Sequence, residues 1–273
     1  MSKTEINNAP TLAQLQLDRG LHYGDGLFET IAIKSGIPEL LDEHIARLKE
    51  SCERLKFINV DFLKIKKTIR HNANNLGKGI IKLIVTRGSG GRGYLIPDDM
   101  TPTYLLLQYP WPDYNIENWD KGVTIRKCDI VPGNQPLLAG MKHLNRLENV
   151  LARMELKNTI FQEGILCDSE QNVIEATSSN VFIVINNKII TPKLEKCGVS
   201  GVMRDQVIKK AIANNMQIEI QDIPYKTLLD ADEIFLTNSV IGIWPVANLN
   251  ERMYSEFPIT RKLMILLNIN YHE

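Results

Sequence analysis

Two residues of the chain, Lys142 and Glu175, have side chains and sequence surroundings that suit chemistry on a carbonyl group. Lys142 follows the small, turn-like pair Ala139-Gly140 and precedes a predicted helix. Lysines are mostly solvated, so the simplest interpretation is a surface residue. If Lys142 is instead buried near the positive end of that helix, its ammonium form is disfavoured and the neutral amine can form a Schiff base.

Glu175 interrupts the strand-like run Val173-Ile-Glu-Ala-Thr177 with a carboxylate. One interpretation is a strand residue that faces solvent. The other is a buried carboxylate, which would need a cationic partner such as a protonated ring nitrogen.

Two short segments have the features of an anion-binding site. The segment Cys197-Gly-Val-Ser-Gly-Val-Met-Arg204 leads into a predicted helix, and Ser200 or Gly201 can adopt the non-helical cap conformation. The free N–H groups and the dipole of that helix would favour a phosphate. The polar triplet Thr237-Asn238-Ser239 ends a predicted strand and could close the same site. The alternatives are a plain helix cap and a polar turn.

The run Gly88-Ser-Gly-Gly-Arg-Gly93 has the spacing GxGxxG and follows a predicted strand. A dinucleotide fingerprint also needs these glycines to open a helix. Pro97 would interrupt such a helix, so the sequence argues against a Rossmann site. The run is either a flexible turn or a loop that presents the guanidinium of Arg92 to a carboxylate.

Arg47 and His44 lie on one predicted helix but are not distinguished by their spacing. Arg47 is offset by about 100° from the middle of the apolar stripe. His44, at the edge of the stripe, is expected to be a packed or partly solvated histidine rather than a catalyst.

The elements that must position these residues alternate between strands and amphipathic helices, as in an α/β (α+β) chain. The first half predicts a strand at 28–34, helices at 42–57 and 61–76, and strands at 79–87 and 103–109. The second half predicts a helix at 143–158, hairpins at 164–176 and 181–191, a helix at 202–215, strands at 217–223 and 233–237, and a short helix after Pro224. Asp42 is placed to cap the first helix, and Gly77 to end the second.

Prolines mark the expected boundary between two domains. The motif Pro110-Trp-Pro112 and the prolines at 132 and 136 favour an interdomain connection at 111–140. The predicted domains are therefore an N-terminal α/β domain at 1–110 and a C-terminal α/β domain at 141–273.

The composition limits the partners of the chain. Its 273 residues contain 32 Lys plus Arg and 32 Asp plus Glu, so nucleic acid is not expected as a partner. An apolar fraction of 44% with 23% charged residues argues against disorder. The 4 cysteines are too dispersed for a zinc site or a disulfide framework, and no run is apolar enough to span a membrane. We expect an intracellular, cytoplasmic protein without a bound metal.

Taken together, five ordered segments resemble the class IV pyridoxal-phosphate enzymes, the fold type of the branched-chain and D-amino acid aminotransferases. The five segments are Tyr23–Thr30 (YGDGLFET), His44–Leu48 (HIARL), Lys142–Leu151 (KHLNRLENVL), Glu175–Asn180 (EATSSN) and Gly198–Arg204 (GVSGVMR). They cover nearly the whole chain, and their common order argues against a chance match.

The resemblance implies a two-domain fold-type IV structure, similar to D-amino acid aminotransferase, with pyridoxal 5'-phosphate as cofactor. It implies that Lys142 forms a Schiff base with the cofactor, Glu175 pairs with the pyridinium nitrogen and Arg47 binds the phosphate. The other implied phosphate ligands are the backbone of Val202 and Met203, and Ser239.

Within the family, the chain is most similar to the lyases that form 4-aminobenzoate. The similarity lies in the loop Arg87–Tyr94, in the segment Met141–Glu148 and in Thr30, where many branched-chain transaminases have glycine. It implies cleavage of 4-amino-4-deoxychorismate to 4-aminobenzoate and pyruvate, a step of folate precursor synthesis. Lys142 would then remove the proton while Thr30 assists the leaving group. The implied substrate ligands are Arg92 and Asn238.

Two alternatives stay open. A D-amino acid or branched-chain aminotransferase of the same fold would show a second half-reaction with a 2-oxo acid. A binding protein that kept the fold and lost the chemistry would lack one of the expected residues, and none is missing. The resemblance also implies a homodimer that acts on a small molecule, away from membranes.

Overall fold

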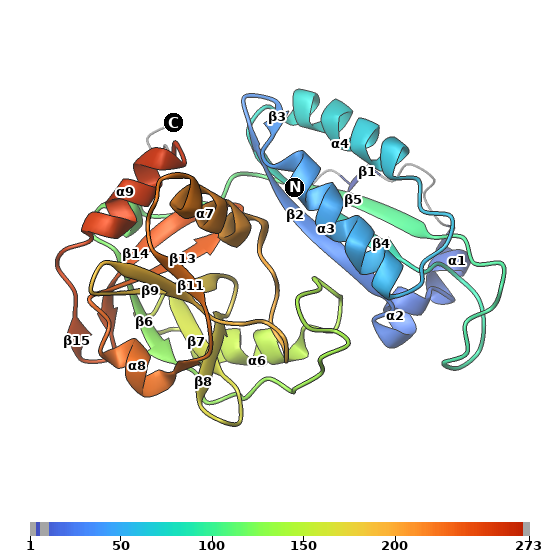
Figure 1. Ribbon diagram of the computed structural model, residues 1–273. Helices are drawn as coiled ribbons and strands as arrows, with labels where there is room; N and C mark the ends of the chain where they lie inside the picture. Colours follow the sequence, from blue (N-terminus) through green and yellow to red (C-terminus); the bar gives the residue numbers. More distant parts are fainter. Residues whose placement is uncertain (1–3, 6–10, 270–273) are drawn as a thin grey trace. The chain divides into compact units, whose positions relative to one another are not determined.

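The computed structural model describes residues 4–5 and 11–269 and divides the chain into two compact units (Figure 1). Unit 1 consists of residues 1–113 and 141–145, and unit 2 of residues 114–140 and 146–273. Residues 114–140, which the sequence assigns to a connection, form part of unit 2 because they contain a helix and a strand of its sheet.

Unit 1 is an antiparallel sheet with helices α3 and α4 on one face (Figure 1). Its described strands are β1 (Thr4–Glu5), β2 (Gly26–Lys34), β3 (Ile37–Pro38), β4 (Gly79–Thr86) and β5 (Thr103–Tyr109), in the order β1-β5-β4-β2-β3. Its described helices are α1 (Leu12–Gln16), α2 (Arg19–Tyr23), α3 (Leu41–Arg54) and α4 (Phe62–Leu76). The predicted strands and helices of this half are confirmed to within a few residues.

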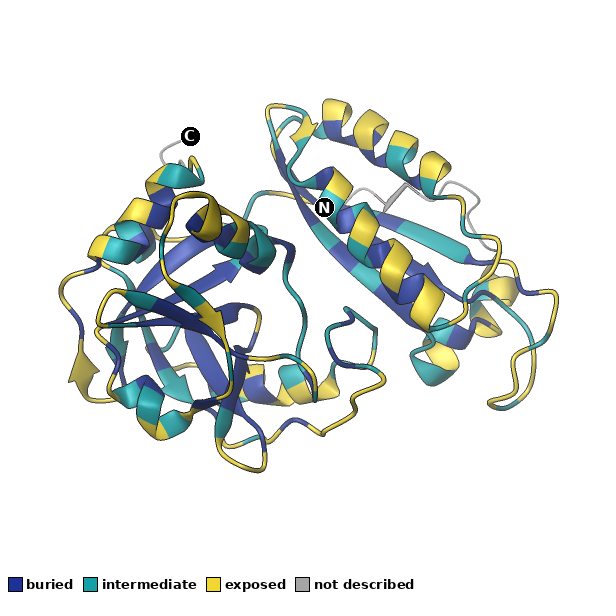
Figure 2. Cartoon of the chain, viewed as in Figure 1, coloured by how far each residue is buried: buried dark blue, intermediate teal, exposed yellow. Residues whose placement is uncertain are grey.

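Strand β2 shows how the sequence builds this layer. Side chains alternate between the two faces of a strand, and Ile31 and Ile33 of β2 are fully buried on the face that α3 covers (Figure 2). Glu29 lies on that same face. Phe28 and Thr30 point to the opposite face and are half-buried.

The caps of the two long helices differ from each other. The carboxylate of Asp61 caps α4 by accepting a hydrogen bond of 2.9 Å from the N–H of Lys64, and Gly77 ends the helix as predicted. The prediction that Asp42 caps α3 is wrong, because the helix begins one residue earlier, after Leu40. Asp42 therefore lies inside the first turn, where its charge still favours the helix dipole.

Unit 2 is built around a mixed sheet. In its described part the strand order is β11-β10-β9-β13-β14-β6-β7-β8-β12, with β15 beside β14. The strands are β6 (Val123–Lys127), β7 (Glu163–Cys167), β8 (Asn172–Ala176), β9 (Asn180–Ile185), β10 (Lys188–Thr191), β11 (Ile218–Ile220), β12 (Ile223–Pro224), β13 (Glu233–Asn238), β14 (Gly242–Leu249) and β15 (Arg252–Met253). The helices are α5 (Glu117–Asp120), α6 (Leu147–Glu155), α7 (Val202–Ala213), α8 (Tyr225–Leu229) and α9 (Pro258–Leu266).

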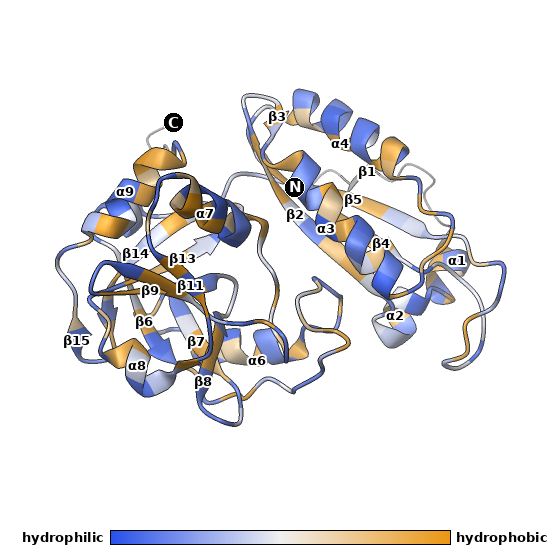
Figure 3. Cartoon of the chain, in the orientation of Figure 1, coloured by the Kyte–Doolittle hydropathy of each residue, from blue (hydrophilic) through white to orange (hydrophobic). Residues whose placement is uncertain are grey.

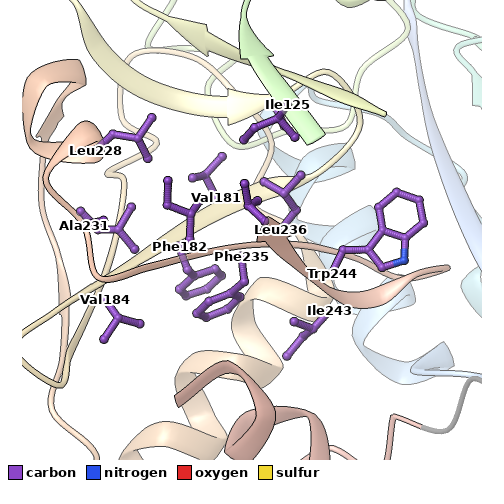
Figure 4. Packing of buried hydrophobic residues seen from close by; sticks show 14 of the residues in the cluster. Ile125, Val181, Phe182, Val184, Leu228, Ala231, Phe235, Leu236, Ile243 and Trp244 are labelled. Atoms are coloured by element: carbon purple, nitrogen blue, oxygen red, sulfur yellow. The ribbon is translucent and has the colours of Figure 1, made fainter. Parts of the chain in front are cut away.

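Aromatic side chains fill the centre of unit 2 (Figure 4). Phe182 on β9 and Phe235 on β13 are cross-strand partners, and their rings stack 4.8 Å apart at an angle of 3°. Trp244 on β14 meets the ring of Trp119 edge-on at 5.5 Å. The core thus fixes β13, whose end carries the polar triplet at 237–239.

Helix α6 differs from its prediction in length and in burial. It starts at Leu147 rather than at residue 143, because the residues before it pair with β2 in extended conformation. Its apolar residues Leu147, Val150, Leu151 and Met154 are 50–76% exposed. The described residues leave this stripe of α6 uncovered, as the exposed and hydrophobic colours of Figures 2 and 3 show.

Among the described residues, no helix combines the length and apolar character that crossing a membrane requires.

Candidate active site

Lys142 is held against β2 in unit 1. Its carbonyl oxygen accepts a hydrogen bond of 2.9 Å from the N–H of Phe28, and Leu144 donates to Gly26 at 3.0 Å. The lysine Nζ lies 4.4 Å from the centre of the Phe28 ring and is half-buried. The expected position just before the first turn of a helix is therefore wrong, because the next helix begins at Leu147. An extended segment along a sheet edge positions the lysine instead.

Thr30 lies on the same face of β2 as Phe28, the ring that Lys142 contacts. Its cross-strand partner is Lys82 of β4, whose Nζ lies 5.1 Å from the same ring. Unit 1 therefore brings a hydroxyl and two ammonium groups to one sheet face. The sequence analysis did not identify Lys82, although a lysine inside the apolar run GIIKLIVT could have indicated it.

Arg47 is part of a buried charge cluster on the other face of β2. The carboxylate of Glu29 accepts hydrogen bonds from Arg47 Nε at 2.9 Å and from His44 Nδ1 at 2.6 Å. Burial alone would raise the pKa of Glu29, but the charge of Arg47 and the hydrogen bond from His44 outweigh it and lower the pKa to about 2. His44 is fully buried rather than partly solvated.

Glu29 is a second residue near the candidate site that the sequence did not single out. A carboxylate on the apolar face of a predicted strand, with His and Arg three residues apart on the next helix, was the available signal. The cluster fixes the guanidinium of Arg47, since two of its nitrogens donate to Glu29.

Glu175 is 6% exposed in β8, so the solvent-facing interpretation is wrong. Its Oε2 accepts a hydrogen bond of 2.8 Å from the N–H of Val199, and its Oε1 lies 3.4 Å from Asn149 Nδ2. Gly198 takes a left-handed φ of +85°, and a Cβ there would meet Glu175 Oε2 at 3.4 Å. The loop before α7 therefore passes close to this carboxylate.

The start of α7 is a cradle of backbone N–H groups. Gly201 is its N-cap and carries no side chain, so no side chain caps Val202 and Met203. A Cβ at Gly201 would lie 2.0 Å from Asn180 Oδ1, so a side chain here would require the amide of Asn180 to move. Asn180 is in turn the cross-strand partner of Thr237.

The triplet at 237–239 has three different environments. The hydroxyl of Thr237 is buried and has no hydrogen-bond partner within the described parts of the chain. Asn238 Nδ2 donates to the carbonyl of Ser178 at 3.2 Å, and its Oδ1 accepts from the N–H groups of Val240 and Ile241. Ser239, which follows, is half-buried.

Arg92 lies on an exposed loop of unit 1. No helix follows the glycines at 88–93, so the exclusion of a Rossmann site is confirmed. Gly88 has a φ of +99°, and a Cβ there would lie 2.0 Å from the carbonyl oxygen of Thr101. The loop is thus closed tightly at its base.

Comparisons with known proteins identify the family of the chain. The profile of the Amino-transferase class IV family matches residues 26–249, so the chain belongs to this family. It is 40% identical to a 4-amino-4-deoxychorismate lyase of Pseudomonas aeruginosa, with a TM-score of 0.93 and all of both chains covered. It is 34% identical to an aminodeoxychorismate lyase of Vibrio harveyi over 96% of this chain and 98% of the relative. A D-alanine aminotransferase of Bacillus licheniformis is 30% identical over 85% of this chain and 82% of its own length.

The cofactor of this family is pyridoxal phosphate, and the residues present fit it. A helix start that no side chain caps and the unpartnered hydroxyl of Thr237 suit a phosphate. Glu175 is a buried carboxylate of the kind that a pyridinium nitrogen needs. Lys142 is an amine placed on an aromatic ring rather than in bulk solvent.

Proposed function

We propose that the protein is a pyridoxal-phosphate-dependent lyase that converts 4-amino-4-deoxychorismate to 4-aminobenzoate and pyruvate. The observation that carries the proposal is the placement of Thr30 and Lys142 on one face of β2, which joins a base with a hydroxyl. The full-length similarity to lyases of Pseudomonas aeruginosa and Vibrio harveyi supports it.

Each part of the cofactor has proposed ligands among the residues described above. Lys142 Nζ would hold it covalently, and Glu175 would keep its ring nitrogen protonated. The proposed phosphate ligands are Arg47, the N–H groups of Val202 and Met203, and Ser239. When bound, pyridoxal phosphate supplies an electron sink for the carbanion that forms next to the substrate nitrogen.

The remaining residues act on the substrate. With the cofactor bound, Lys142 would accept the proton from the ring carbon that bears the substrate nitrogen, and positioned base catalysis of this kind contributes roughly 10²- to 10⁴-fold. Thr30 donates a hydrogen bond to the ether oxygen that leaves with the enolpyruvyl group. Arg92 binds a substrate carboxylate with its planar guanidinium. Asn238 contributes an amide to substrate binding.

An analysis of products tests the proposal. Purified protein loaded with pyridoxal phosphate is incubated with freshly prepared 4-amino-4-deoxychorismate, and pyruvate and 4-aminobenzoate are measured. We expect equal amounts of both, and neither from Lys142→Ala. Transfer of the amino group to a 2-oxo acid without 4-aminobenzoate would instead support the aminotransferase alternative, which the D-alanine aminotransferase relative represents.

We further propose a homodimer in the cytoplasm. The exposed apolar stripe of α6, formed by Leu147, Val150, Leu151 and Met154, supports a second copy as its cover, because a stripe of this kind rarely faces water unpartnered. The four cysteines are free and buried, which suits a reducing compartment. Sedimentation should give twice the mass of the chain, and Leu151→Glu should shift it toward one copy.

A further inference from the structure

A buried arginine that the proposed chemistry does not use lies at the start of unit 1. Arg19 belongs to the short helix α2 and is 3% exposed. Its Nε donates to Asp25 Oδ2 at 2.9 Å. Its terminal nitrogens donate to three consecutive carbonyls, those of Gly93 at 2.9 Å, Tyr94 at 3.2 Å and Leu95 at 3.5 Å. These carbonyls directly follow Arg92.

Arg19 needs those carbonyls as hydrogen-bond acceptors, because the carboxylate beside it is shared with a second arginine. Asp25 Oδ2 also accepts a hydrogen bond from Arg87 Nε at 2.8 Å, so two guanidinium groups share one carboxylate. Arg87 satisfies its other nitrogens with the carbonyls of Leu55 and Lys56. Arg19 satisfies its own with the loop. A buried cation without such acceptors is costly, so the burial of Arg19 and the position of the loop stabilise each other.

Gly93, the residue that follows Arg92, is held by a hydrogen bond on each side. The N–H of Gly93 donates to Tyr23 Oη at 2.9 Å, and the carbonyl of the same residue accepts from Arg19. The Tyr23 ring lies 4.9 Å from the Arg19 guanidinium, so both anchors belong to one cluster. Because the N–H of Gly93 belongs to the peptide bond after Arg92, its orientation sets the direction in which Arg92 leaves the backbone.

The side chains of the loop are largely exposed, although the Tyr94 ring meets the Tyr23 ring edge-on at 5.5 Å. Tyr94 and Leu95 are each 87% exposed. Their backbone faces Arg19 while their side chains face outward. The loop at 92–95 is therefore held mainly through main-chain hydrogen bonds, and three of these come from the side chain of Arg19.

We propose that Arg19 is a positioning residue that orders the loop at 92–95 and thereby orients Arg92 for a substrate carboxylate. The ordering follows from contacts within unit 1, whereas its effect on catalysis rests on the proposed function. A preorganised guanidinium loses less entropy when the carboxylate binds, so the effect belongs in substrate affinity rather than in the chemical step.

The test combines hydrogen exchange with kinetics. In Arg19→Gln we expect the backbone amide of Gly93, which donates to Tyr23 Oη, to exchange at least tenfold faster in the protein without substrate. In the protein loaded with pyridoxal phosphate, KM for 4-amino-4-deoxychorismate should rise about tenfold while kcat changes less than about twofold. Arg19→Lys should restore part of both. The matched control Arg70→Gln, which removes an exposed arginine of α4, should change neither.

A second variant guards against a folding defect. Tyr23→Phe removes only the acceptor of the Gly93 N–H, so we expect faster exchange at Gly93 and a rise in KM of about two- to threefold. Folded Arg19→Gln or Tyr23→Phe protein with parental exchange at Gly93 would overturn the ordering, whatever the activity. Faster exchange with parental KM in an active enzyme would overturn the link to Arg92. An inactive parental protein would contradict the proposed function, while the exchange result would still decide the ordering.

Discussion

Two buried carboxylates, Glu29 in unit 1 and Glu233 in unit 2, are stabilised in different ways. In unit 1, Glu29 pairs with Arg47 and His44. In unit 2, Glu233 accepts hydrogen bonds of 2.7–2.9 Å from the hydroxyl and N–H of Thr260 and from the N–H of Ile259. The same holds for Glu175, which accepts from a backbone N–H and an amide.

The difference matches what each unit contributes to the proposed site. Unit 1 presents cations, namely Lys142 and the guanidinium groups of Arg47 and Arg92. Unit 2 presents dipoles, namely the uncapped start of α7 and the hydroxyl of Thr237. Substitutions in unit 1 should therefore change charge and proton transfer, whereas substitutions in unit 2 should change how the cofactor is held and tuned.

The largest effect should come from Lys142, the cation of unit 1 that is proposed to bind the cofactor covalently. Lys142→Ala should lower turnover on the order of 10³- to 10⁴-fold, because the base and the attachment point are lost together. Borohydride reduction followed by peptide mapping should place the pyridoxyl group on Lys142 of the parental protein and nowhere in the variant. An adduct on another lysine would contradict the assignment.

Glu175→Gln tests the carboxylate that unit 2 contributes to the proposed site. An amide cannot stabilise a protonated ring nitrogen as a carboxylate does, so turnover should fall roughly 10²-fold, the size expected for loss of one electrostatic contact. Cofactor occupancy, measured by absorbance, should stay nearly parental. Normal turnover in a loaded, folded variant would show that Glu175 has only a structural role.

Glu29 should give unit 1 a stability that depends on pH. The pKa of this carboxyl is lowered from 4.5 to about 2, so its contribution is complete above pH 4.5 and is lost as the pH falls toward 2. This amounts to about 3 kcal/mol. The difference in the free energy of unfolding between parental protein and Glu29→Gln, measured with denaturant, should shrink by that amount. A difference that is constant from pH 5 to 2 would refute this account.

Thr30→Val removes a hydroxyl from the face of β2 on which Lys142 and Lys82 lie, while keeping the shape of the side chain. Loss of one hydrogen bond to the leaving oxygen costs on the order of 1 to 3 kcal/mol, or roughly a five- to hundredfold lower rate of pyruvate release. Binding of the substrate amine, followed by absorbance, should be spared. Pyruvate release at the parental rate would mean that Thr30 serves packing only.

Thr237→Val should have the smallest effect. It should stabilise the protein without cofactor but weaken the binding of the cofactor. Without cofactor, removing a buried hydroxyl that has no partner in the described chain should raise the free energy of unfolding by about 1 kcal/mol. With cofactor, the same change should weaken pyridoxal phosphate binding about five- to tenfold, as measured by titration. Unchanged affinity would remove Thr237 from the phosphate site.

Hydrophobic spacing predicts most of the helices and strands correctly. Where the prediction is wrong, tertiary contacts override the local spacing. The alternation in β2 and the apolar spacing in α3 and α4 concern neighbouring residues, so the sequence reveals them. Lys142 was expected beside a helix because its following residues have helical spacing, yet hydrogen bonds to β2 keep them extended. Strand β14 was not predicted, and Pro245 inside it is the kind of residue that argues against a strand.

The same contrast between local pattern and tertiary contact applies to the site residues. Motifs brought Lys142, Glu175 and the glycines before α7 to attention, because their residue types are informative by themselves. The roles of Glu29 and Arg19 depend on partners that are distant in the sequence, such as Arg47 and the carbonyl of Gly93. Composition and spacing alone do not show which of these residues pair.

The discontinuous make-up of unit 1 has a consequence for its synthesis. The edge of β2 at Gly26–Phe28 is paired by the segment at 142–144, which the ribosome makes only after residues 114–140 of unit 2. Until then this edge has unpaired main-chain groups, and such edges invite pairing with other chains. A nascent chain or fragment that stops at Asp113 should therefore self-associate. The segment that carries Lys142, the proposed cofactor lysine, therefore also pairs with this sheet edge.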